Sequence, residues 1–265
     1  LKGGITTVNV NPGSGNAIGG QAATLKTFGH RVDDMVMRAP SGVKSALGEN
    51  PKRVYGGKDK TPSTRLGTAM VIRKAFAEAQ NWIDEGKTGR NIALEPLIAV
   101  LKREIPWRQH SHRADDIATA LRLQEEFGYD LVIDHGTEAH VIADVLAEKG
   151  VPVLIGPLFT TKSKVELRGR SIANPGKLAR AGVEISLITD HPVIPINFLM
   201  HQVTLAIKEG LDRETALRAV TINPAKVLGV DARVGSLEVG KDADLVLWST
   251  DPIDIMARAE RVWID

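Results

Sequence analysis

The sequence predicts an α/β protein built around a parallel β-sheet, and three observations support this fold class. Short apolar runs at residues 131–133, 151–155 and 183–188 are typical of buried parallel strands. Stretches with the apolar spacing of helices lie between them, at 114–127 and 139–149. Strands and helices alternate at intervals of roughly 20 to 35 residues, which is the pattern of βαβ units.

The composition places the chain among globular proteins and excludes several function classes. Its 265 residues are 43% apolar, with a net charge of +2 and no cysteine, which excludes disulfides, thiolate catalysis and zinc-finger sites. Scattered basic residues argue against nucleic acid as a partner. There is no signal-peptide pattern and no run of roughly 18 apolar residues that a membrane helix needs. We expect a cytoplasmic protein with a small-molecule substrate, no membrane partner and the capacity to form a homo-oligomer.

The pattern is regular from residue 90 onward and less regular upstream of it. Residues 5–10 and 42–47 have strand-like apolar patterns. The segment 48–61 is rich in glycine, lysine and proline, so we expect a loop there. A long helix is predicted from about residue 62 to residue 85, and a second one over 93–102.

Past residue 170 the elements become shorter and the last ones are β-rich. Asn174 and Pro175 are typical of an N-cap and a first helical position, which predicts a helix over 175–181. Both ends of the chain have strand character, and we expect them to be cut through the body of a fold. The remaining predicted elements are helices over 197–208 and 213–220, turn-rich β structure over 234–248 and a strand over 261–265.

Three predicted strand ends carry side chains that bind metals. His110 and His112 follow the extended segment 105–109, and positions i and i+2 of a strand face the same way. His135 ends the next apolar strand, and Asp190 ends the last one. Because the carboxyl ends of parallel strands meet at one edge of a sheet, these residues together predict a metal site. Each has a plainer alternative when taken singly, namely a loop or core histidine, or a helix cap at Asp190.

Weaker candidates flank this predicted site. Lys44 is a lone cation in a strand that should be buried, and Glu49 follows the same strand. Either would give a fourth ligand, Lys44 only after carboxylation to a carbamate. Lys164 and Arg168 belong to a long cationic loop, residues 157–170, and would hold an acidic group of a substrate. A surface lysine and a solvated loop explain the same residues, so both alternatives stay open.

The C-terminal part of the chain strongly resembles the signature of the amidohydrolase superfamily. The matching stretches are TINPAKVLG at 221–229 and GSLEVGKDADLV at 235–246. His135-Gly136-Thr137 resembles the sixth-strand motif of that family, Thr189-Asp190 the eighth, and His110-Ser111-His112 the fifth. Residues 3–8 are similar to its second strand. The likeness covers nearly the whole chain and is nearest to the imidazolonepropionase and prolidase-like branch.

The resemblance implies a metal-dependent hydrolase with a (β/α)₈ TIM-like barrel. Strands two to eight would lie within residues 1–228, and the C-terminal part of a small β-sandwich domain within 229–265. His110 and His135 would be metal ligands, with Lys44, carboxylated, or else Glu49 as the fourth-strand ligand. Asp190 would contact the metal and take a proton from the attacking water, and His112 would hydrogen-bond the substrate or the reacting oxygen. Zinc is the favoured ion, with iron or manganese as alternatives and one or two ions open.

One feature departs from the family pattern. The family has a His-x-His pair on its first strand, whereas His30 is the only histidine here before His110. The His110-Ser111-His112 segment cannot be that pair, because about 80 residues up to Asp190 are too few for seven further strands at roughly 30 residues per βα unit. We therefore expect the chain to lack the first strand and the N-terminal half of the sandwich.

The function that the resemblance implies is hydrolysis of a C–N bond in an amide, cyclic amide or dipeptide by a metal-activated water. A truncated or catalytically silent protein of the same fold stays open as an alternative, as does a deaminase of the same superfamily. A cofactor-dependent barrel lyase would need a Schiff-base lysine or a phosphate site, and the sequence identifies neither.

Overall fold

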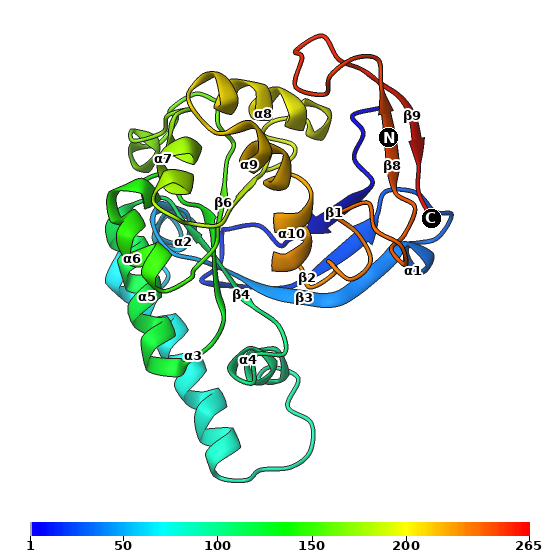
Figure 1. Ribbon diagram of the computed structural model, residues 1–265. Coiled ribbons are helices and arrows are strands. Elements are labelled where there is room, and N and C mark those ends of the chain that lie inside the picture. Colours follow the sequence, from blue (N-terminus) through cyan, green and yellow to red (C-terminus); the bar gives the residue numbers. More distant parts are fainter. Residues whose placement is uncertain (1) are drawn as a thin grey trace.

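The computed structural model describes residues 2–265 and contains a curled seven-stranded sheet (Figure 1). Its strands are β1 (Thr7–Val10), β2 (Ile18–Lys26), β3 (Val36–Ala46), β4 (Trp107–Ser111), β5 (Leu131–His135), β6 (Val153–Ile155) and β7 (Ile185–Leu187). They lie side by side in chain order. β3 to β7 are parallel, as predicted, whereas β2 runs antiparallel to both β1 and β3.

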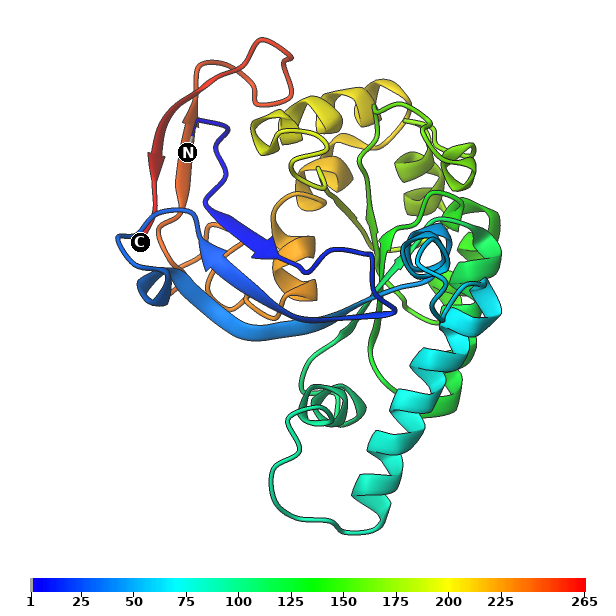
Figure 2. The ribbon, with the colours of Figure 1, turned by 180° about the vertical axis from the view of Figure 1, so that it is seen from behind.

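Most of the helices pack around the parallel strands of the curled sheet (Figure 2), whereas the four-residue helix α1 lies at the far end of the β2–β3 hairpin. The α-helices are α1 (Val32–Met35), α2 (Glu49–Gly56), α3 (Arg65–Asp84), α4 (Glu95–Leu101), α5 (Ala114–Phe127), α6 (Ala143–Glu148), α7 (Asn174–Arg180), α8 (Leu199–Lys208), α9 (Arg213–Arg218) and α10 (Ile222–Val227). Short 3-10 helices are η1 (Ala139–Ile142), η2 (Val165–Leu167) and η3 (Ile196–Phe198). Within residues 2–265, none of the helices combines the length and apolar character needed to cross a membrane.

The main core lies between the sheet and these helices. Every residue of β4 and β5 is buried. Trp107 of β4 meets Phe76 of α3 at a ring-centroid distance of 4.7 Å, and Tyr129 stacks on Phe76 at 4.8 Å. Because side chains alternate along a strand, Arg108 and His110 point to the opposite, concave face. The face of β4 that carries Trp107 packs toward the helices, and the other face places Arg108 and His110 inside the curl.

Three segments differ from the sequence prediction. β2 was not predicted, because its glycines and Gln21 interrupt any apolar alternation. The predicted loop 48–61 begins with α2, whose first turn contains Glu49 and Pro51, residue types that suit a helix start. Asn174 is the first residue of α7 rather than its N-cap. Its side-chain amide donates to the carbonyl oxygens of Thr137 (3.1 Å) and Gly169 (2.9 Å).

The C-terminal region forms a two-stranded antiparallel sheet of β8 (Leu245–Trp248) and β9 (Ala259–Trp263), where the sequence predicted part of a β-sandwich. Lys26 at the end of β2 joins this region to the main sheet. Its buried ammonium pairs with Asp242 at 2.8 Å and with Asp244 at 2.7 Å.

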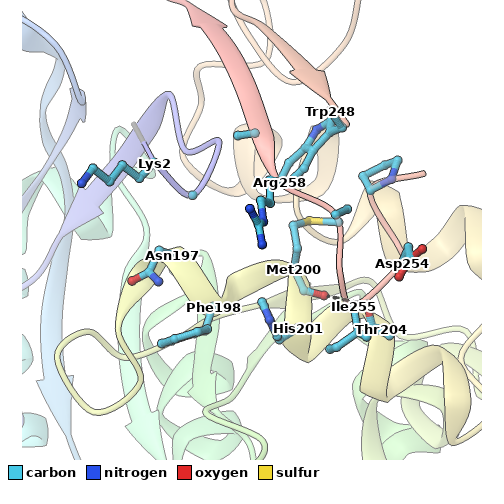
Figure 3. Close-up of a pocket in the computed structure, with 14 residues that line it drawn as sticks. Lys2, Asn197, Phe198, Met200, His201, Thr204, Trp248, Asp254, Ile255 and Arg258 are labelled. Atoms are coloured by element: carbon cyan, nitrogen blue, oxygen red, sulfur yellow. Dashed lines mark hydrogen bonds between the residues drawn. The ribbon is translucent and has the colours of Figure 1, made fainter. Parts of the chain in front are cut away.

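Two cavities flank α8. One, of about 320 Å³, lies between the start of α8 and the β8–β9 hairpin, and Figure 3 shows Arg258 and His201 pointing into it. The other, of about 370 Å³, is a mostly apolar groove between residues 3–7 and α8 to α10. Neither is lined by any of the candidate metal-binding residues.

Candidate metal centre

Three histidines predicted at strand ends come together at the carboxyl edge of the parallel sheet. His110 lies in β4, His112 follows that strand, and His135 is the last residue of β5. The register pairs Ser111 with His135, so the two strands end at the same level. This edge is where the functional groups of parallel α/β folds gather.

The three imidazoles form a compact buried cluster. The ring centroids of His110 and His135 lie 4.5 Å apart, those of His110 and His112 4.7 Å, and those of His112 and His135 4.9 Å. One ring nitrogen from each can be chosen so that all three lie within 4.8 Å of one another. The exposed fraction of each residue is 5% or less.

Neighbouring polar groups fix two of these rings. His135 Nδ1 donates to the carbonyl oxygen of Gly156 at 2.8 Å, because a carbonyl only accepts, and this leaves the Nε2 lone pair free. His112 Nδ1 is 2.8 Å from the hydroxyl of Thr137. His135 also has a positive φ of 75°, a strained conformation for this residue and one that occurs preferentially at functional sites.

The third ring and the electrostatics make this cluster fit a divalent cation. His110 Nδ1 is buried and has no hydrogen-bond partner, which is costly unless another ligand satisfies it. Burial, together with the two neighbouring imidazoles, lowers the pKa of His110 well below its usual value. Burial also lowers the pKa values of His112 and His135, against the opposing effect of Asp190 on His135. Neutral imidazoles are the form that binds metals.

Lys44 is buried beside this cluster but is paired within the protein. Its ammonium contacts Asp134 of β5, and Arg108 Nη2 donates to the other carboxylate oxygen at 2.8 Å. Burial alone would raise the pKa of Asp134, yet Arg108 and Lys44 outweigh it and hold that pKa well below its usual value. A carbamate on Lys44 would be negatively charged, so it could form only if this ion pair with Asp134 opened.

The other sequence candidates lie around the cluster and not within it. Asp190 follows β7 with a positive φ of 52°, is exposed, and its charge acts on His135. Glu49 starts α2, and its backbone N–H donates to Glu166 Oε2 at 2.8 Å. Arg168 is exposed, and only its carbonyl oxygen, which accepts from Lys162 Nζ at 2.9 Å, has a side-chain partner among residues 2–265.

Comparison with known proteins identifies the family of this chain. A sequence model described as "Amidohydrolase family" matches residues 1–263. The chain belongs to the amidohydrolase family. A crystal structure of an amidohydrolase from Thermotoga maritima MSB8 superposes with a TM-score of 0.97 at 47% identity, covering 100% of this chain and 71% of that one.

Two curated amidohydrolase relatives are more distant. The amidohydrolase tasK of Hapsidospora irregularis is 28% identical over 298 residues, which cover 100% of this chain and 30% of that protein. The imidazolonepropionase of Thermoplasma acidophilum is 28% identical over 196 residues, covering 71% of this chain and 45% of that protein. The chain thus spans less than half the length of these two relatives.

The structure also brings two charged residues of the 157–170 loop close to the histidine cluster. Glu166 is 1% exposed, and its Oε1 lies 3.8 Å from His112 Nε2. Arg170 acts on the pKa of His112 and donates to the carbonyl oxygens of Thr160 and Thr161 at 3.2 Å each. The sequence predicted Lys164 and Arg168 of this cationic loop as residues that hold a substrate, whereas Glu166 and Arg170 were not singled out. Nothing in the sequence indicated that Glu166, the one acidic residue of this basic loop, would be buried.

Proposed function

We propose that this amidohydrolase is a metal-dependent hydrolase that cleaves a C–N bond in a small amide, cyclic amide or dipeptide with water. The buried cluster of three neutral histidines at the sheet edge carries the proposal. The family and the curated relatives support a hydrolase, and the bond type is inferred from the family resemblance of the sequence.

His110 and His135 would hold the ion in this proposal. The free Nε2 of His135 and the unpartnered Nδ1 of His110 are the nitrogens available to it. A divalent cation supplies Lewis acidity there, polarising a carbonyl and making a water molecule more acidic. Imidazole and carboxylate ligands suit zinc first, and also iron or manganese.

The remaining side chains would handle protons and orient the substrate. Asp190, at the same edge and within electrostatic reach of His135, would accept the proton of the attacking water and pass it to the leaving nitrogen. His112 would donate from Nε2 to the reacting oxygen, with Nδ1 held by the Thr137 hydroxyl. Lys164 would bind an acidic group of the substrate.

We also infer that the curled sheet belongs to a TIM-like barrel with one further strand between β7 and β1, although β2 departs from the (β/α)₈ pattern by running antiparallel to its neighbours. These two strands are the edges of the sheet within residues 2–265. The apolar groove beside residues 3–7 is the type of surface that such a strand would cover.

The assay that tests the function uses zinc-loaded protein and three substrate groups: N-acyl amino acids, prolyl dipeptides and cyclic amides. We expect amine or acid release from one group, abolished by a chelator and restored by zinc. Ammonia release from an aminopurine alone would favour a deaminase instead. No turnover by protein with one bound zinc per chain would contradict hydrolysis and favour a silent member of the family.

A further inference from the structure

Lys164 of the 157–170 loop lies close to the histidine cluster. Lys164 immediately precedes η2, and its side chain is 21% exposed. Its Nζ donates to Asn50 Oδ1 at 2.5 Å, while Asn50 Nδ2 lies 3.4 Å from His110 Nε2. Only one side-chain amide therefore separates the ammonium from a candidate metal ligand. The charge of Lys164 also acts on both His110 and His112.

Two residues hold this ammonium in place. Asn50 is itself fixed, because its Nδ2 also donates to Ser14 Oγ at 2.8 Å. Glu166 Oε1 lies 3.9 Å from Lys164 Nζ and has no hydrogen-bond partner among residues 2–265. Side-chain entropy normally keeps a surface lysine mobile, so this double contact marks Lys164 as ordered in advance of binding.

Contacts with the start of α2 and with α3 fix the position of Glu166. Its Oε2 accepts from the backbone N–H of Glu49 at 2.8 Å and lies 3.7 Å from Arg65 Nη2. Gly48 leaves room for it, since a Cβ there would come within 2.8 Å of Oε2. Gly48 also has a φ of 89°, which disfavours any other residue. Burying a carboxylate to this extent reduces the stability of the fold, while the contacts of Glu166 keep the 157–170 loop docked.

We propose that Lys164 is the specificity-determining residue of this site, and that it selects substrates with a carboxylate a few bonds from the scissile C–N bond. Asn50 and Glu166 are positioning residues for it. An ammonium has three N–H donors, and Asn50 takes only one, so donors remain for an anion. The short path from Lys164 through Asn50 to His110 limits how far the carboxylate can lie from the reacting carbonyl. The substrate class in this inference rests on the proposed hydrolysis, whereas the anion site does not depend on it.

The anion site can be tested without turnover. Glutarate is titrated into metal-free protein by calorimetry, so that the carboxylates cannot bind a metal. Lys164→Met should weaken binding at least 10-fold, and Lys164→Arg should restore most of it. Lys162→Met is the matched control, because Lys162 is an exposed lysine of the same loop, and it should bind like the parent protein. Equal glutarate affinity in Lys164→Met and the parent would overturn the proposal.

Turnover gives the second readout. The assay compares an N-acyl amino acid with its uncharged amide. Lys164→Met should lower the ratio of kcat/KM for the acid to kcat/KM for the amide at least 10-fold, because the KM of the acid rises. Zinc content and thermal midpoint should stay unchanged. An unchanged ratio in a folded, active variant would overturn the inference and leave the hydrolase standing. Glutarate binding that depends on Lys164, without turnover of any substrate, would overturn the hydrolase and leave the anion site standing.

Discussion

At the scale of single residues, the site combines neutral histidines with a neighbouring buried group of charges. The three imidazoles have lowered pKa values, so they remain unprotonated at neutral pH. Beside the histidines, Asp134 forms ion pairs with both Lys44 and Arg108. Asp134 offsets part of this positive charge, although Lys44 still lowers the pKa values of the three histidines.

A substitution at His112 distinguishes whether this residue binds the metal or contacts the substrate. We predict that His112→Phe, which fills a similar volume without a nitrogen, retains one zinc per chain. It should lower kcat by roughly 100-fold, the cost of one lost donor to the reacting oxygen. Elemental analysis and steady-state kinetics measure the two effects. Loss of zinc from the folded variant would instead make His112 a third ligand.

Asp134 should stabilise the fold in a pH-dependent way. Because its pKa is lowered by folding, its contribution is present above about pH 4, where an unfolded aspartate is ionised, and is lost as pH falls toward the folded pKa. Asp134→Asn should cost about 3–5 kcal/mol in urea unfolding at pH 7 and less at pH 3. Asp130→Asn, which opens an exposed pair with Arg103, should stay within about 0.5 kcal/mol. The same loss in both variants would refute this role.

At the scale of elements, the sequence predicts what local pattern determines. α5 has its predicted bounds because an amphipathic run ends at Gly128, which adopts the left-handed conformation that closes a helix. β2 and α2 escaped prediction because polar and glycine residues there are stabilised by partners far along the chain. Glu49, for example, is held by Glu166, 117 residues away. The pairing of Lys44 with Asp134 spans 90 residues, so the spacing of residues in the sequence does not predict it either.

The packing of α3 on the sheet is the most direct test of an element. Phe76 is fully buried between Trp107 and Tyr129, so Phe76→Ala should lower the free energy of unfolding by about 3–5 kcal/mol. Leu66→Ala on the same helix is the control, because Leu66 is 84% exposed and should cost no more than about 0.5 kcal/mol. Chemical unfolding measures both. Similar values for the two would mean that α3 is not anchored through this cluster.

At the scale of the whole molecule, a single sheet edge joins residues from three distant parts of the chain. The strand ends carrying His110, His135 and Asp190 were predictable, because apolar runs that stop at a polar residue mark where parallel strands end. Which of them touch was not, since the curl of the sheet brings the histidines together while Asp190 stays exposed. The 157–170 loop docks over the same edge through Glu166.

Zinc titration of metal-free protein by calorimetry tests the central claim, that this edge is a metal centre. We predict one equivalent of zinc bound per chain, a higher thermal midpoint on binding, and loss of both in His135→Ala. His30→Ala, an exposed histidine away from the site, should bind like the parent protein. Absence of zinc binding, or equal binding by His135→Ala and the parent, would contradict the account.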